Sequence, residues 1–156
     1  MPTRHVPASP GIDIAVTEWP SPGNPPLLVL HGIGSCAQTW DNVAPALAER
    51  HHLYVLDHRG HGASAKPDTG YLLPDYAADL DAIIANLGIP DAHLNILGHS
   101  LGALITMTWA ADNPGRARRI LLEDPPLRMV PEILEAYDGW VQLNAMPPAQ
   151  VAAWYA

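Results

Sequence analysis

The amino-acid sequence predicts an α/β protein whose mostly parallel β-sheet carries helices on both faces. Three observations lead to this fold class. Several short apolar runs lack the polar alternation of half-exposed strands, which is typical of strands buried on both faces. Each run is followed at once by glycine, aspartate or a loop stopped by proline. Segments with helical spacing lie between the runs, and strands that alternate with helices favour a parallel sheet.

The predicted strands follow one another along the chain. The segment 12–16 alternates apolar and polar residues, so it is expected to be a half-buried strand. The runs expected to form buried strands lie at 27–32, 53–57, 94–98 and 120–126. The last of them ends in an Asp-Pro-Pro loop, and no strand-like run follows it.

Three helices are expected between these strands. The first, around 40–47, is indicated by apolar residues at helical spacing. The second, at 74–88, collects its apolar residues on one side and ends at Gly88, a residue suited to the left-handed position after a helix. The third follows the run at 94–98 and is closed by Pro114.

Composition excludes several classes of protein. The 156 residues are 48% apolar and 15% charged, with a formal net charge of −8, which is typical of a globular domain. The only basic cluster is Arg116, Arg118 and Arg119, so neither nucleic acid nor an anionic membrane is an expected partner. Cys36 is the only cysteine, which fits a reducing compartment. With no signal-peptide or membrane-span pattern, a cytoplasmic protein is expected, without a metal or organic cofactor.

Residues 98–102 read GHSLG, between an apolar run and a helical segment. In this context G-x-S-x-G predicts a sharp turn from strand to helix that holds the serine in a strained conformation. The flanking glycines are needed because a side chain there would collide with the neighbouring backbone. The helix start adds free N–H groups and the positive end of a dipole. Ser100 is therefore predicted to be a catalytic nucleophile.

Two further motifs agree with this interpretation. His-Gly stands at 31–32 after one strand, and D-x-R-G-x-G-x-S covers 57–64 after the next. Together with G-x-S-x-G at 98–102, these motifs resemble the amino-terminal half of a cap-containing enzyme of the α/β-hydrolase fold. The resemblance covers roughly residues 11–126. The serine separates the chain from the haloalkane dehalogenases and epoxide hydrolases of this fold, which use aspartate at the elbow.

The resemblance implies a division of the chain and an activity. Residues 1–126 would form the amino-terminal part of the hydrolase core, and 127–156 would begin a helical cap or lid. The apolar residues of 127–156 also fit ordinary packing helices. The implied substrate is a small acyl compound: a carboxylic ester, a lactone, or a diketone cleaved at its carbon–carbon bond. An oxyanion hole is implied from the amide of Leu101 and that of Ile33 or Gly34.

The catalytic base is missing from this pattern. The family order is nucleophile, acid, histidine, yet all eight histidines precede Ser100. Asp124 is a candidate acid directly after the run at 120–123, or else it caps the Asp-Pro-Pro turn. The chain is predicted to lack the last strands and helices of the fold. It is a fragment, or a second chain or segment supplies the histidine, or it is a catalytically inactive binding protein.

A dinucleotide-binding domain is the further alternative. Residues 32–37 match G-x-G-x-x-A after a strand, and Asp57 ends the next strand as a ribose-binding acid would. However, a helix starting within these glycines would carry Pro45 about three turns in, at a cost of about 3 kcal/mol. A helix starting near position 41 places that proline in its first turn, where it is tolerated. The dinucleotide interpretation also leaves the Ser100 turn unexplained.

Overall fold

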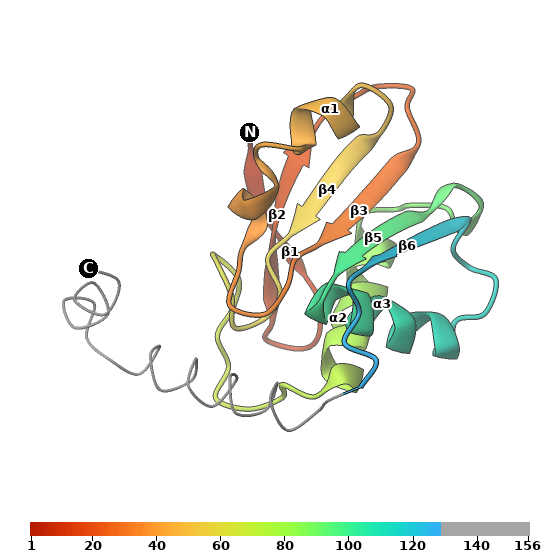
Figure 1. Cartoon of the computed structure of the whole chain (residues 1–156). Coiled ribbons are helices and arrows are strands. Elements are labelled where there is room, and N and C mark those ends of the chain that lie inside the picture. The colour runs from red at the N-terminus through yellow and green to blue at the C-terminus, as the bar shows by residue number, and fades with distance from the viewer. Residues whose placement is uncertain (129–156) are drawn as a thin grey trace, which may run out of the picture. The chain divides into compact units, whose positions relative to one another are not determined.

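A computed structural model describes residues 1–128 of the chain. Of these residues, Met1–Pro125 forms one compact unit. Within these residues the sheet has six strands in the order β1-β2-β4-β3-β5-β6 (Figure 1). The strands are β1 Thr3–Pro7, β2 Asp13–Trp19, β3 Pro26–Leu30, β4 His52–Leu56, β5 Asn95–His99 and β6 Arg119–Glu123. Pairing is antiparallel from β1 to β2 and from β2 to β4, and parallel from β4 through β3 and β5 to β6. The predicted α/β class with a mostly parallel sheet is confirmed.

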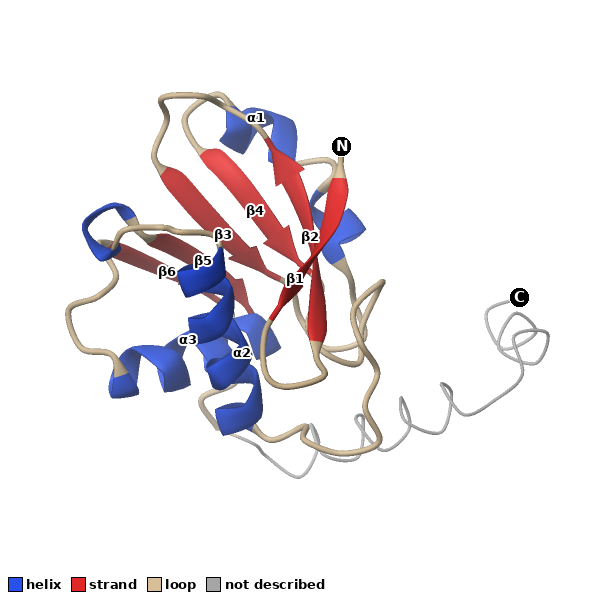
Figure 2. Cartoon of the chain, turned by 180° about the vertical axis from the view of Figure 1, so that it is seen from behind, coloured by secondary structure: helices blue, strands red, loops and turns tan. Residues whose placement is uncertain are grey.

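Helices lie on both faces of the sheet. Helices α2 (Leu73–Asn86) and α3 (Leu101–Asp112) pack together on one face (Figure 2). Within residues 1–128 the other face carries only short pieces, the 3₁₀ turn η1 (Ala37–Trp40) and α1 (Ala44–Ala48). A further 3₁₀ turn, η2 (Asp91–His93), precedes β5.

The helix expected around 40–47 is shorter than predicted. The chain forms η1, leaves the helical pattern at 41–43 and starts again as α1 at Ala44. Pro45 stands in the first turn of α1, where its missing N–H leaves no helical hydrogen bond unmade. Residues 31–36 form an irregular loop, and η1 follows this loop before α1 begins.

Three of the four apolar runs became the buried strands β3, β4 and β5, because each of these strands contributes to two cores. The expected burial of the fourth run is wrong within the described residues, since β6 is an edge strand and mostly exposed. Along β3, Leu28 and Leu30 face the core under α2 and α3. The alternate residues Leu27 and Val29 face the core under η1 and α1. A strand buried on both faces needs apolar residues at every position, which explains the absence of polar alternation. Strand β1 was not predicted, since most of its residues are exposed.

Strand β6 is the outermost strand of the described sheet. It pairs with β5 alone within these residues, and Leu121 on it is 62% exposed. An apolar groove of about 410 Å³ lies beside it. The groove is lined by Leu27, Leu47, His51, Asn95, Ile96, Leu97, Arg119, Ile120 and Leu121. Of the cap expected at 127–156, positions 129–156 lie outside the described residues.

Candidate active site

Ser100 occupies the turn between β5 and α3. Its backbone has φ 50° and ψ −112°, a region that residues with a side chain rarely adopt. A Cβ atom at Gly98 would lie 2.4 Å from the carbonyl oxygen of Gly102, and one at Gly102 would lie 2.6 Å from that of Leu30. Both glycines are therefore required by close backbone approach. The predicted strand–turn–helix geometry around Ser100 is present.

Main-chain hydrogen bonds fix this turn to the strands on either side. The Ser100 N–H donates to the carbonyl oxygen of Glu123 at the end of β6 (2.9 Å). The Gly102 N–H donates to the carbonyl oxygen of His31, which follows β3 (3.1 Å). The Ser100 carbonyl accepts the first hydrogen bonds of α3, from Ala103 and Leu104. The strained residue is thus held by its backbone on both sides, as a strained position must be to persist.

The loop after β3 begins against Ser100. A Cβ atom at Gly32 would lie 3.3 Å from that of Ser100, so a side chain at position 32 would crowd the serine. The Gly34 N–H, one of the two predicted oxyanion donors of this loop, donates to Nε2 of His61 (3.2 Å). In the described part of the chain, the Ile33 and Leu101 amides have no acceptor. Of the two loop alternatives, Ile33 is therefore the one with a free amide.

Two buried histidines below this loop are held neutral. His31 is fully buried, and burial is the main cause that lowers its pKa to about 4. Its Nδ1–H donates to the Gly32 carbonyl (2.7 Å), and its Nε2 accepts the His58 N–H (3.2 Å). The His58 Nε2–H donates to the His31 carbonyl (2.9 Å), and burial lowers the pKa of His58 well below its ordinary value. Both rings therefore serve to hold the loops together.

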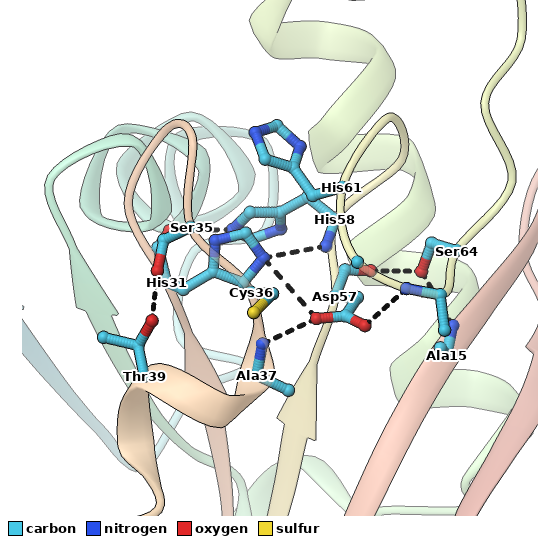
Figure 3. Close-up of polar contacts among 12 residues, drawn as sticks. Ala15, His31, Ser35, Cys36, Ala37, Thr39, Asp57, His58, His61 and Ser64 are labelled. Atoms are coloured by element: carbon cyan, nitrogen blue, oxygen red, sulfur yellow. Dashed lines mark hydrogen bonds and ion pairs between the residues drawn. The ribbon is translucent and has the colours of Figure 1, made fainter. Parts of the chain in front are cut away.

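Asp57 joins the loops that follow β3 and β4 (Figure 3). Its carboxylate accepts the Ala37 N–H (2.6 Å) and the Ala63 N–H (2.8 Å). A Cβ atom at Gly62 would lie 2.0 Å from the same carboxylate, which explains that glycine. The carboxylate also approaches Nε2 of His31 at 4.0 Å. This approach is no ion pair at neutral pH, because the low pKa of His31 leaves the ring uncharged.

The dinucleotide alternative does not fit this arrangement. Asp57 is almost completely buried and its carboxylate oxygens accept the main-chain amides of Ala37 and Ala63, so the carboxylate is not presented to a ribose hydroxyl. No α-helix begins within 32–37, and the first one starts at Ala44. A pyrophosphate at these glycines would therefore not meet a helix N-terminus, which is the physical basis of the motif.

Asp124 lies at the end of β6, beside the Ser100 turn. In the register of β5 with β6, His99 pairs with Glu123, so the residues that follow each partner are neighbours at the same edge of the sheet. Asp124 is exposed and has φ 45°. Among the non-glycine residues of the described part, only Ser100 and Asp124 have positive φ. Nothing in the sequence pattern predicted the backbone conformation of Asp124.

No base for Ser100 is present in the described part of the chain. All eight histidines lie between positions 5 and 99, and within residues 1–128 none forms a hydrogen bond with the Ser100 hydroxyl. Residues 1–128 also contain no group of three or more metal-ligating side chains. Among the same residues, no helix has the length and apolar character needed to cross a bilayer. The role of His61 as the acceptor for Gly34 was missed, because only the fold brings these two loops together.

Comparison with known proteins shows that the chain is similar to hydrolases. The family described as alpha/beta hydrolase fold matches residues 25–151. The chain is 36% identical over 121 residues to the 2-(acetamidomethylene)succinate hydrolase of Mesorhizobium japonicum, covering 78% of this chain and 43% of the relative. It is 42% identical over 102 residues to the N-formylmaleamate deformylase of Pseudomonas putida, covering 65% of this chain and 37% of the relative.

A solved structure agrees with these sequence matches. The crystal structure of an N-formylmaleamic acid deformylase from Pseudomonas putida S16 superposes with a TM-score of 0.78 at 32% identity. The match covers 91% of this chain and 56% of that protein. The chain therefore spans roughly half the length of the relatives and structures that it matches.

Proposed function

The chain belongs to the alpha/beta hydrolase fold family, and from this premise we propose that it carries the nucleophile, oxyanion hole and acid of a serine-dependent acyl hydrolase. One observation carries the proposal. Ser100 is held at positive φ between two glycines that close backbone contacts require, next to two amides without an acceptor in the described residues. Stored backbone strain of this kind persists where the surrounding structure enforces it, and it clusters at active sites.

In the proposed reaction the Ser100 hydroxyl attacks the substrate carbonyl while a histidine takes its proton. The Ile33 and Leu101 amides stabilise the oxyanion of the tetrahedral intermediate, a contribution of about 3 kcal/mol per donor in related chemistry. The intermediate collapses when the leaving nitrogen or oxygen takes the proton back from the imidazolium. Water, activated by the same histidine, then hydrolyses the acyl-serine and releases the carboxylic acid.

We assign the acid to Asp124. Its neighbour Glu123 accepts the hydrogen bond of the Ser100 N–H, so the backbone of Asp124 is tied to the nucleophile turn. Its positive φ directs the chain away from the line of β6 directly after the strand. A carboxylate at this edge of the sheet is suited to orient an imidazole that faces Ser100. A capping role in the Asp-Pro-Pro turn is the weaker interpretation, because it does not account for the positive φ of Asp124.

The base is proposed to come from outside these 156 residues. His31 and His61 use both ring nitrogens in the loop contacts described above, and His58 uses its Nε2. His99 directly precedes Ser100 at the end of β5, and within residues 1–128 its ring forms no hydrogen bond with the Ser100 hydroxyl. A histidine supplied by a second chain or by a further segment would complete the triad. Free imidazole offers a way to test this, because it can enter an open site and act as the base.

The leaving group is proposed to be an amide nitrogen as well as an ester oxygen. The names of the two relatives above describe a hydrolase of an acetamido compound and a deformylase of a formyl amide. Both names refer to compounds that carry an acyl group on nitrogen, a bond that a serine nucleophile could cleave by attack on the carbonyl carbon. Small N-acyl and N-formyl compounds therefore belong in the substrate panel beside carboxylic esters and lactones.

The test compares the wild-type chain with Ser100→Ala after incubation with a fluorophosphonate, with and without imidazole. Intact mass should show one adduct on the wild-type chain, increased by imidazole, and none on the variant. The same additions should support slow hydrolysis of activated acyl compounds by the wild-type chain only. A folded wild-type chain that stays unlabelled under both conditions would contradict the proposal and favour the catalytically inactive binding protein.

A further inference from the structure

We propose that His61 is a positioning residue that fixes the conformation of the loop after β3, called the oxyanion loop below. It does so by accepting the Gly34 N–H, which leaves the Ile33 N–H as the donor from this loop to the substrate. The inference rests on the proposed function, since it concerns the same oxyanion hole. His61 belongs to the loop after β4, whereas Gly34 belongs to the loop after β3. The contact between them is therefore made by the fold.

The two ring nitrogens of His61 have opposite roles. Nδ1 lies 3.0 Å from the Arg59 carbonyl oxygen, which can only accept, so Nδ1 carries the proton. Nε2 lies 3.2 Å from the Gly34 nitrogen, whose N–H can only donate, so Nε2 is the acceptor. The geometry thus requires the neutral ring in its Nδ1–H form, and the ring bridges the two loops.

The end of the bridge at Arg59 is rigid. The Arg59 guanidinium and the Asp79 carboxylate form a bidentate pair, with both nitrogen–oxygen distances at 2.6 Å and both side chains almost completely buried. The Arg59 Nη1 also donates to the Gly70 carbonyl (2.8 Å). The ring of His61 also lies near that of His31, with centroids 5.2 Å apart and the ring planes tilted by 59° (Figure 3). The His61 ring is therefore held in a fixed position, from which its Nε2 contacts the exposed loop after β3.

The end at Gly34 needs such support. Gly34 is exposed and adopts φ 69°, a conformation that glycine leaves easily because it has no Cβ atom. The turn over Ile33 and Gly34 is closed by a bond from the Ser35 N–H to the Gly32 carbonyl (3.3 Å), and the next anchor to the loop after β4 is Ala37, which donates to Asp57. Without the imidazole, no bond to the loop after β4 would hold the peptide groups between Gly32 and Ala37, and we expect them to sample several orientations. An oxyanion donor is effective only when it is already oriented before the reaction.

The first measurement is the ring state of His61 in the wild-type chain. Long-range ¹H–¹⁵N spectra near pH 8 distinguish the two neutral forms of each histidine. We expect His61 as a single Nδ1–H form, with the Gly34 amide shifted when His61 is replaced. A ring that carries its proton on Nε2, or that averages between both forms, would overturn the inference, because Gly34 could not then be held.

The second measurement is the rate at which a fluorophosphonate labels Ser100 in the presence of imidazole. His61→Leu removes the acceptor and should slow labelling about threefold to tenfold, the range of one hydrogen bond. His61→Gln keeps an acceptor of similar reach and should restore most of the rate. His93→Gln, at an exposed position in η2, is the control and should match the wild type. Far-UV circular dichroism checks that each variant is folded.

The two proposals fail differently. Equal rates for His61→Leu and the wild type would contradict the inference while leaving Ser100 as the nucleophile. A wild-type chain that is never labelled would contradict the proposed function, and the ring state of His61 would then decide alone whether the imidazole holds the loop. A fixed Nδ1–H form together with a slowed His61→Leu and a rescued His61→Gln supports both.

Discussion

Replacing Asp57 by asparagine tests whether its carboxylate holds the two loops beside the nucleophile. The carboxylate accepts two main-chain N–H groups, from Ala37 and Ala63, and it is almost completely buried. Asparagine keeps one acceptor oxygen and presents an NH₂ group to the other amide. One charge-assisted bond is lost, worth about 1.5–3 kcal/mol, and one buried donor is left without a partner, which costs about 1–3 kcal/mol. Because these two costs overlap, we expect a loss of about 2–4 kcal/mol.

The assay is equilibrium unfolding of the chain in urea, monitored by far-UV circular dichroism. Asp41→Asn is the matched control, because Asp41 is exposed and lies on the same loop region without a side-chain hydrogen bond among the described residues. The control should stay within about 0.5 kcal/mol of the wild type. If Asp57→Asn also stays within that range, the carboxylate does not hold the loops and the account of Asp57 is wrong.

Three further predictions concern the same unit. Gly102→Ala should lower the free energy of unfolding in urea by about 1–3 kcal/mol, because the new Cβ would lie 2.6 Å from a carbonyl oxygen of β3. An unchanged unfolding midpoint would contradict this close contact. Asp79→Ala should cost about 3–5 kcal/mol by leaving a buried guanidinium unpaired. The control Asp91→Ala, at the exposed end of another ion pair, should cost less than about 1 kcal/mol, and equal losses would refute the argument. Burial lowers the pKa of His31 to about 4 and that of His58 well below its ordinary value. Below pH 6.5 the unfolded chain therefore binds more protons than the folded chain, so the free energy of unfolding should fall as the pH drops to about 4, by about 3 kcal/mol for His31 alone. A flat profile from urea melts at several pH values would show that neither ring is buried neutral.

Apolar runs predicted β3, β4, β5 and β6 as strands, but only the first three are buried as expected, since β6 pairs with β5 alone in the described residues and is mostly exposed. Strands β3, β4 and β5 are covered on both faces, so their apolar runs were unambiguous. Strand β1 is mostly exposed and ends at Pro7, and neither property distinguishes it from a loop. The region 40–47 was predicted as one helix because its apolar spacing is helical, but the position of Pro45 starts the helix later.

The candidate site divides in the same way between local and long-range features. The conformation of Ser100 was predictable because the G-x-S-x-G pattern lies within residues 98–102, although the contact that requires Gly102 is made with Leu30 of β3. The contact of His61 with Gly34 spans 27 residues of sequence, and that of Asp57 with Ala37 spans 20. Such pairs become visible only when parallel strands bring their carboxyl ends to one edge. The choice of Ile33 over Gly34 depended on one of them, so the sequence left it open.

The order of the strands has a consequence for how the chain folds during synthesis. Once β4 has inserted between β2 and β3, each later strand adds beside one already made: β5 joins β3, and β6 joins β5. If the strands pair in the order of their synthesis, the sheet extends on one side only, from β3 to β5 to β6. The Ser100 N–H then gains its acceptor, the Glu123 carbonyl, only when β6 pairs with β5. Among the described elements, the backbone support of the nucleophile turn would therefore be completed after the strands on its other side.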